Sequence, residues 1–100
     1  MSFKEIQREY SLGDVVCSVK GRDAQKYFIV VKVVDEQYVL IADGALHRLA
    51  KPKKKKVKHL KFMQHNIEQI AQKLKDETKV FDSEVRTAIE SLNLTNKGEE

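Results

Sequence analysis

The residues of this chain most able to do chemistry are the lysines of one short segment, Lys51 to Lys61. Seven of its eleven residues are lysine. Side chains of one charge sign repel one another at this density, so a folded protein gains no stability by gathering them. Phosphate groups relieve that repulsion and release counterions, which favours a polyanion as partner. Four interpretations are open: a nucleic-acid contact, a nuclear import signal, a membrane-surface patch and a solvated segment.

The residues around the run help to separate these interpretations. Val57 and Leu60 interrupt it, and Phe62 follows it. Apolar side chains at these positions indicate that the segment is held against a folded core. Residues 52–58, Pro-Lys-Lys-Lys-Lys-Val-Lys, also fit a nuclear import signal, but such signals work best on flexible segments. We therefore expect RNA binding, ahead of a plain solvated face and of nuclear import through Pro52–Lys58.

The charge of the chain is divided unevenly along its length. Residues 1–62 carry 14 Lys and Arg against 7 Asp and Glu, whereas residues 63–100 carry 5 against 8. The balance is therefore +7 in the first part and −3 in the second. A basic part that faces a polyanion is the simplest interpretation of this split, and it places the expected function in residues 1–62.

The remaining reactive side chains give no support for catalysis or for a bound metal. The three histidines, His47, His59 and His65, lack cysteine partners and regular metal-ligand spacing. Cys17 is the only cysteine and lies in an apolar segment, so an inert thiol is expected. No enzyme activity, cofactor or metal is expected. The charged start of the chain and the lack of an apolar run of about 20 residues predict a cytoplasmic protein without a membrane span.

Strands and helices must position these residues. Short segments rich in β-branched and aromatic residues predict a meander of four or five strands. The expected strands include Asp14–Val19, Lys26–Val34, Tyr38–Ala42 and Ala45–Leu49. Asp43-Gly44 is a strong signal for a two-residue hairpin turn, and Pro52 marks the end of regular pairing. A lone sheet of this size would expose its edges, so a small closed barrel is expected.

The hydrophobic period changes after Met63. Two stripes at i, i+3, i+4, i+7 predict two amphipathic helices, built on Ile67, Ile70, Ala71 and Leu74 and on Val85, Ala88, Ile89 and Leu92. Asp82 or Ser83 is the expected N-cap of the second helix. We expect the helices to pack on each other and on the open end of the barrel; the alternative is a groove for a protein partner. The predicted fold class is α+β, with the barrel in residues 1–62 and a helical extension in residues 63–100.

Residues 13–35 resemble the KOW motif. In that motif a strand ends in a basic-Gly-x-Asp turn, here Lys20-Gly-Arg-Asp23, and a second strand runs to an acidic turn, here at Asp35. Tyr38–Gly44 and Arg48–Lys56 match the motif's next strand and its basic exit. The resemblance covers roughly residues 11–61, and the chain is most similar to bacterial relatives of the KOW-bearing large-subunit ribosomal proteins of archaea and eukaryotes. It implies an SH3-like barrel that contacts RNA through its loops.

The resemblance and the charges together predict the RNA-binding residues: Lys20, Gly21, Arg22, Lys26, His47, Arg48, Lys51, Lys53, Lys54, Lys55, Lys56 and Lys58. Gln25 stands where the motif usually has a glycine, so either it adopts a positive φ at a modest cost or the loop takes another shape. Tyr27, Phe28 and Tyr38 could stack on bases. Core positions are the commoner role of such residues. Phe28 belongs to the better core row, which leaves Tyr27 as the candidate to follow.

We therefore expect an RNA-binding KOW-domain protein that associates with the ribosome and its rRNA. Barrel loops and the lysine run would hold phosphates, while a few loop residues set the orientation. The alternative from another class is a transcription-elongation or protein-interaction module, in which the same barrel binds polymerase or a ribosomal protein. The helical extension could bind a further protein partner.

Overall fold

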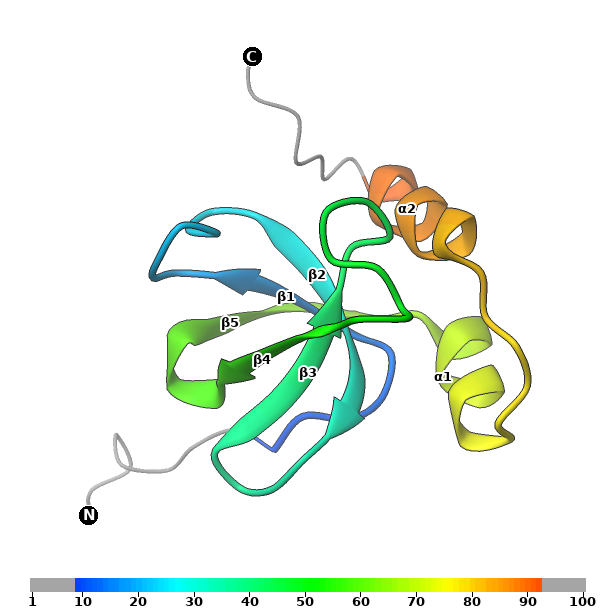
Figure 1. The fold of residues 1–100 in the computed structure, drawn as a ribbon, viewed down its shortest axis with the longest axis horizontal. Helices are drawn as coiled ribbons and strands as arrows, with labels where there is room; N and C mark the ends of the chain where they lie inside the picture. The colour runs from blue at the N-terminus through cyan, green and yellow to red at the C-terminus, as the bar shows by residue number, and fades with distance from the viewer. Residues whose placement is uncertain (1–8, 93–100) are drawn as a thin grey trace.

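Five antiparallel strands and two helices make up residues 9–92, the part of the chain that this computed structural model describes (Figure 1). The strands are β1 (Asp14–Ser18), β2 (Tyr27–Val33), β3 (Tyr38–Ala42), β4 (Lys53–Lys56) and β5 (Leu60–Asn66). A 3-10 turn, Val57–His59, joins β4 to β5, and the helices α1 (Glu68–Lys75) and α2 (Asp82–Ser91) follow. The predicted α+β class and the two helices are confirmed.

The strand order in the sheet is β4-β3-β2-β1-β5. The two edge strands are consecutive in the sequence, with only the three residues of the 3-10 turn between them. No backbone pairing joins β4 to β5 within residues 9–92, so the sheet is not closed into a barrel. The register shifts once between β2 and β3 and once between β1 and β5. Such bulges bend a strand and increase its local twist, which curls the sheet.

The returning strand lies later in the sequence than expected. Ala45–Leu49 forms turns instead of a strand, because the Asp43 carboxylate accepts the backbone N–H groups of both Ala45 and His47 at 2.9 Å. Those two donors are thereby lost to any strand pairing. The strand that pairs with β3 is β4, which is the lysine run itself, with Tyr38 opposite Lys56 and Ile41 opposite Lys53.

The change from strand to helix also comes later than expected. β5 continues to Asn66 because its residues pair along β1, from Ser18 opposite Leu60 to Asp14 opposite Asn66. The division expected after residue 62 therefore falls inside β5. Helix α2 begins at Asp82, and neither Asp82 nor Ser83 is its N-cap, a position held by Phe81. The Asp82 carboxylate instead accepts the N–H of Leu49 at 2.8 Å and so anchors the loop between β3 and β4.

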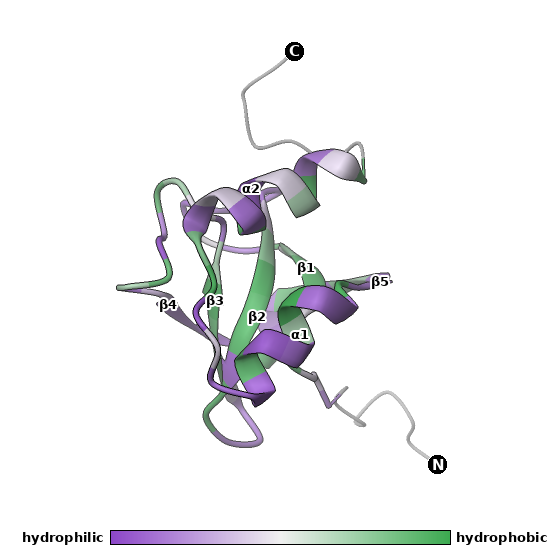
Figure 2. Ribbon diagram, turned by 90° about the vertical axis from the view of Figure 1, so that its right-hand side faces the viewer, coloured by the Kyte–Doolittle hydropathy of each residue, from purple (hydrophilic) through white to green (hydrophobic). Residues whose placement is uncertain are grey.

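The sheet is buried on both faces along its central strands. One face carries the cluster Tyr10, Val16, Phe28, Val30, Val39, Ile41, Val57 and Leu60. The other carries Val15 and Ile29, which pack against Ile70, Val85 and Ile89 of the helices. Figure 2 shows α1 and α2 over the hydrophobic strands. Side chains alternate between the faces of a strand, so β1 and β2 supply both clusters. The helices pack on each other and on the strands, as expected, but over one face of the sheet and not at the open end of a barrel.

Candidate nucleic-acid interface

The loop between β1 and β2 and the 3-10 turn after β4 lie side by side at the edge away from the helices (Figure 1). The N–H of Val19 donates to the carbonyl of His59 at 2.9 Å. The Lys55 ammonium donates to the carbonyl of Lys20 at 3.1 Å. These contacts bring together two basic segments, through residues that are 35 and 40 positions apart in sequence. We call this surface, formed by residues 19–26 and 53–59, the basic edge.

The loop of the basic edge depends on two residues with positive φ. Gly21 has φ +83° and Gln25 has φ 69°. Of the two alternatives stated for Gln25, the structure has the positive φ. Its N–H donates to the carbonyl of Ser18, while the N–H of Ala24 donates to the carbonyl of Gly21 at 3.1 Å. The loop is thus closed by its own backbone, with Gly21 and Arg22 exposed at the surface.

Strand alternation divides the lysine run between the two faces of β4. Lys53 and Lys55 stand opposite Ile41 and Val39, which are buried in the cluster of Phe28. Directly opposed residues share a face, so these two lysines reach toward the loop of the basic edge. Lys54 and Lys56 point to the other face, where the Lys54 ammonium lies 4.7 Å from the centre of the Tyr38 ring.

A buried carboxylate lies beneath the loop. Asp23 is only 6% exposed. Its Oδ2 lies 3.4 Å from the Lys53 ammonium and 3.4 Å from His47 Nε2, at ion-pair range but without a closer hydrogen bond. His47 Nε2 is also 3.4 Å from Asp23 Oδ1. The His47 ring in turn lies against Phe28, with ring centres 5.7 Å apart. Asp23 thereby connects the loop, β4 and the segment after β3.

Two pKa values report the electrostatics of this region. Burial alone would raise the pKa of Asp23, but hydrogen bonding and the charges of His47 and Lys53 outweigh it and leave that pKa lowered. Partial loss of water contact lowers the pKa of His59, and the surrounding cations lower it further: Lys20, Lys58, Lys55 and Lys56. Four lysines from both segments therefore act on a single imidazole, as expected where cations converge.

The structure does not bring every predicted site residue to the basic edge. Those that it brings there are Lys20, Gly21, Arg22, Lys26, Lys53, Lys54, Lys55, Lys56 and Lys58. Arg48 and Lys51 lie in the β3–β4 loop, which is fastened to α2 by Asp82 and by Arg86, whose guanidinium donates to the carbonyl of Gly44 at 2.6 Å. His47 leaves that loop toward Asp23 and is half-buried.

Asp23 is the residue that sequence reasoning left out of the site. It is the single acidic residue between Asp14 and Asp35, placed among Lys20, Arg22 and Lys26. The signal that could have identified Asp23 in the sequence is the presence of a carboxylate in so basic a loop. Such a carboxylate weakens the attraction of the loop for phosphate unless a further cation neutralises it.

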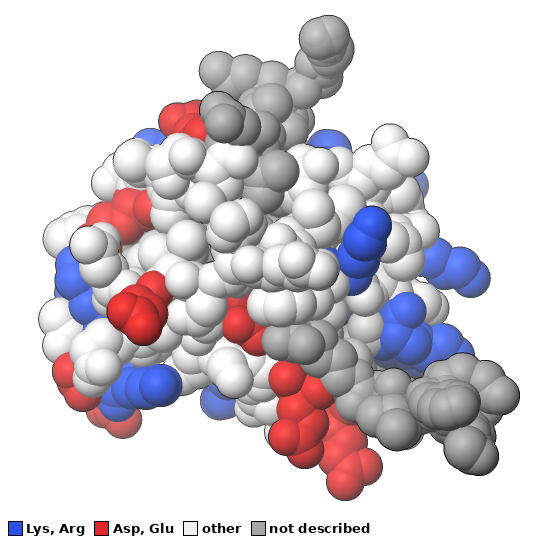
Figure 3. All heavy atoms as spheres, turned by 180° about the vertical axis from the view of Figure 1, so that it is seen from behind, with Lys and Arg blue, Asp and Glu red and all other residues white. Residues whose placement is uncertain are grey.

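The distribution of charge separates the basic edge from the helical side. Figure 3 shows Lys and Arg without Asp or Glu along the right-hand side of the molecule, which is the left-hand side of Figure 1. The opposite side carries both signs (Figure 3). Lys73 of α1 is paired there with Glu84 of α2 at 2.9 Å. On the face that Figure 3 shows, positive charge is therefore gathered on the side of the basic edge.

The three aromatic residues considered for base stacking differ in their distance from the basic edge. Phe28 is fully buried. Tyr27 is partly buried against the cluster that the helices cover, so the expectation of a stacking role is not supported by its position. Tyr38 lies beneath the Lys54 ammonium. Phe28 and Tyr27 therefore lie away from the basic edge, whereas Tyr38 contacts it through Lys54.

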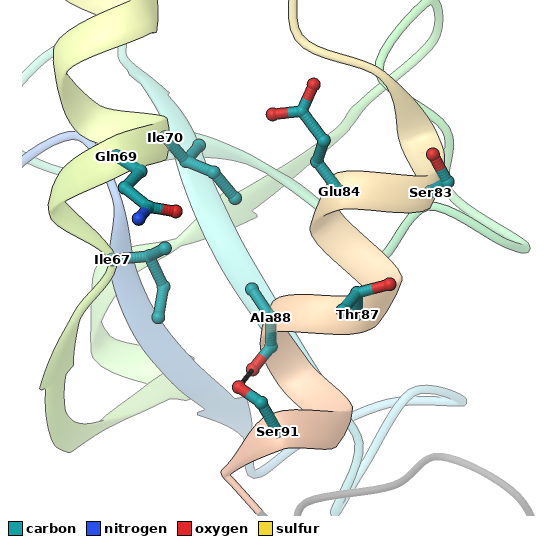
Figure 4. A pocket seen from close by; sticks show the side chains of 8 residues that line it. All are labelled: Ile67, Gln69, Ile70, Ser83, Glu84, Thr87, Ala88 and Ser91. Carbon is teal, nitrogen blue, oxygen red and sulfur yellow. Dashed lines mark hydrogen bonds between the residues drawn. The ribbon is translucent and has the colours of Figure 1, made fainter.

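A groove of about 380 Å³ lies between the two helices (Figure 4). Its walls are Ile67, Gln69, Ile70, Ser83, Glu84, Thr87, Ala88 and Ser91. The Ser91 hydroxyl donates to the carbonyl of Ala88 at 2.8 Å, which leaves this side chain satisfied within its own helix. Glu84 makes the groove unsuited to phosphate. Its use by a protein partner, the alternative role considered for the helices, stays a prediction.

The ion pairs of Asp23 predict how stability responds to acid. A lowered pKa means that ionised Asp23 stabilises the fold above the usual carboxyl pKa of about 4, and that this contribution is lost as the pH falls from there through the lowered value. We expect Asp23→Asn to reduce the free energy of unfolding at pH 5 and to differ less from the parent at pH 3. Urea unfolding at both pH values measures this. A difference that grows toward acid would contradict the ion-pair assignment.

The described residues include neither a metal-binding cluster nor a membrane-spanning helix, and comparisons with other proteins assign no family. Within residues 9–92, no group of three or more His, Cys, Asp or Glu side chains is placed to hold a metal ion. Neither described helix is long and apolar enough to cross a bilayer. No protein-family model matches this chain, and a search of curated proteins finds no match.

Proposed function

We propose that this chain is an RNA-binding protein of the KOW type that works on the ribosome and its rRNA. The observation that carries the proposal is the basic edge, where the Lys55 ammonium donates to the carbonyl of Lys20, and where Lys20, Lys55, Lys56 and Lys58 all act on His59. Two segments distant in sequence are fastened together, so that cations from both of them gather around His59. Fixed cations of this kind neutralise phosphates and release counterions from RNA.

The state of the lysine run favours RNA over nuclear import. Residues 53–56 are a strand whose backbone pairs with β3, and Val57 is buried in the core. A receptor that reads an extended peptide would have to pull this segment off the sheet. Phosphates, in contrast, need only the side chains.

The SH3-like barrel belongs to the same proposal. The strand order places β4 and β5 at the two edges of a curled sheet, and a 3-10 turn of three residues is all that separates them. That connection and the two bulges support a barrel-like path of the chain.

Charge removal at the basic edge tests the proposed function. We expect the triple variant Lys20→Gln, Lys56→Gln, Lys58→Gln to bind rRNA tenfold more weakly or worse, with the slope of log affinity against log salt reduced by about 2. Thermal stability should change little, because exposed charges add little to folding. Filter binding with purified rRNA and co-sedimentation with ribosomes at graded salt measure both quantities.

A matched control removes the same charge elsewhere. Lys32, Lys75 and Lys79 are exposed and lie outside the basic edge, so their combined change to Gln should leave most of the affinity. Equal losses in the two triple variants would show that only net charge matters. Equal affinity of the basic-edge variant and the parent would remove the proposed site.

A further inference from the structure

The buried carboxylate of Asp23 has no role in a surface that only attracts phosphates. It is the most buried charged side chain near the basic edge, at 6% exposure. A negative charge there reduces the local positive charge by one unit and so opposes RNA binding. Burying a carboxylate also costs free energy of desolvation. A buried charge that opposes the function is therefore expected to have another role.

The contacts of Asp23 indicate that use. Its Oδ2 lies 3.4 Å from the Lys53 ammonium and 3.4 Å from His47 Nε2. The side chains of Lys53 and His47 are 39% and 25% exposed, against 9% for Asp23. The Lys53 ammonium and a ring nitrogen of His47 thus both lie beside a carboxylate that water scarcely reaches.

The backbone around Asp23 shows what is held in place. The carbonyl of Asp23 accepts the N–H of Lys26 at 3.0 Å, which closes the turn before β2. Lys53 begins β4, opposite Ile41, and His47 lies in the loop before it, against Phe28. One carboxylate therefore joins the basic loop to the start of β4 and to the segment that leads into it.

We propose that Asp23 is a positioning residue of the RNA-binding surface, and that His47 and Lys53 hold the loop against β4 through it and do not contact phosphate. This inference rests on the proposed RNA-binding function and divides the predicted site residues into two groups. Lys20, Arg22, Lys55, Lys56 and Lys58 meet the RNA, while His47, Lys53 and Asp23 fix the geometry in which they do so.

The two explanations of Asp23 predict changes of opposite sign in the affinity for RNA. If charge alone decides affinity, Asp23→Asn removes a negative charge and RNA binds more tightly. If Asp23 positions the loop, Asp23→Asn releases Lys53 and His47, the loop moves relative to β4, and RNA binds more weakly. We expect a loss of roughly threefold or more, the size of coupling seen between groups of one network.

The control variant removes a negative charge that makes no contact with the basic edge. Glu36 is exposed in the turn between β2 and β3, so Glu36→Gln makes the same change in net charge without touching the basic edge. It should bind rRNA as tightly as the parent or slightly more tightly. Filter binding at two salt concentrations, on samples whose circular dichroism shows that they are folded, compares both variants with the parent. Tighter binding by Asp23→Asn would overturn the inference.

A double-mutant cycle and the salt dependence give a readout that loss of stability does not move. Lys53→Gln should leave the slope of log affinity against log salt unchanged, whereas Lys56→Gln should reduce it by about 0.7–0.9. The double variant Asp23→Asn, Lys53→Gln should bind no worse than Asp23→Asn alone. Should Asp23→Asn fail to fold, the comparison of Lys53→Gln with Lys56→Gln decides.

These outcomes separate the inference from the function on which it rests. A parent protein that does not bind rRNA removes the proposed function. A parent that binds, with a Lys53→Gln variant that lowers the salt slope as Lys56→Gln does, makes Lys53 a phosphate contact and overturns the positioning role alone.

Discussion

A chain that ends after Asn66 should not fold cooperatively by itself. It keeps all five strands and the whole basic edge, but it loses α1 and α2. Val15 and Ile29 are fully buried only because Ile70, Val85 and Ile89 cover them. Removing the helices would leave a broad apolar face of the sheet in water.

The size of this effect on stability follows from the number of apolar side chains that are buried between the helices and the sheet. Burial of an aliphatic side chain stabilises a protein by about 1.5–3 kcal/mol, and the helix-covered cluster has five buried members. Their combined contribution, about 10 kcal/mol, is comparable to the whole stability of a small domain, about 5–15 kcal/mol. We expect the shortened chain to aggregate or to show no sharp thermal transition by circular dichroism.

A chain that ends after Leu92 is the matched control, because it retains both helices. It should show the cooperative transition of the full chain. A sharp transition in the chain ending at Asn66 would mean that the helix-covered cluster is dispensable. In that case the strands alone would be the folding unit.

Hydrophobic spacing was sufficient to predict the helices and the central strands. The stripe Ile67, Ile70, Ala71 and Leu74 falls on α1, with Ile70 and Ala71 buried. The run Lys26–Val34 contains β2, in which three consecutive residues are buried, as expected of a strand whose two faces are both covered. These elements carry their own pattern, so the sequence reveals them without knowledge of their neighbours.

β4 and the β3–β4 loop could not be predicted in the same way. Lys53–Lys56 has no apolar alternation, and it is a strand because β3 offers an unpaired edge. Ala45–Leu49 looks like a strand, but the Asp43 carboxylate takes two of its N–H groups. The first outcome depends on tertiary context, which overrides local β-propensity. The second depends on a neighbouring side chain that competes with strand pairing for the backbone N–H groups.

The candidate site shows a similar division. Charge and motif located the loop and the lysine run, but counting cations treated Lys53 like Lys56. Only the register of β4 shows that Lys53 faces Asp23 while Lys56 faces away. Asp23 was missed because the search was for positive charge.

Replacing Gly13 by alanine should destabilise the protein far more than the same change at Gly21. Both glycines have a positive φ, +88° and +83°, which costs an alanine about 1–2 kcal/mol. At Gly13 a Cβ would also lie 2.7 Å from Ala71 Cβ and 3.0 Å from the carbonyl oxygen of Ile67, so α1 would have to move. At Gly21 its nearest neighbour would be the flexible Lys55 ammonium at 3.4 Å.

The expected losses therefore differ in size and in kind. Gly13→Ala should cost about 2–4 kcal/mol, since overpacking against a fixed backbone adds to the backbone strain. That corresponds to a fall in melting temperature of more than about 10 °C for a domain of this size. Gly21→Ala should cost only about 1 kcal/mol, but it strains the loop that presents Lys20 and Arg22.

Binding to rRNA completes the comparison. At a temperature where both variants are folded, Gly13→Ala should keep the parent affinity, because Gly13 lies under α1 and away from the basic edge. Gly21→Ala should bind more weakly, because the loop of the basic edge has lost the conformation that only glycine adopts without strain. Thermal melts and filter binding on the two proteins measure these changes. Equal melting temperatures would contradict the close approach of α1 to Gly13, and an unchanged affinity of Gly21→Ala would show that the shape of the loop does not matter for RNA.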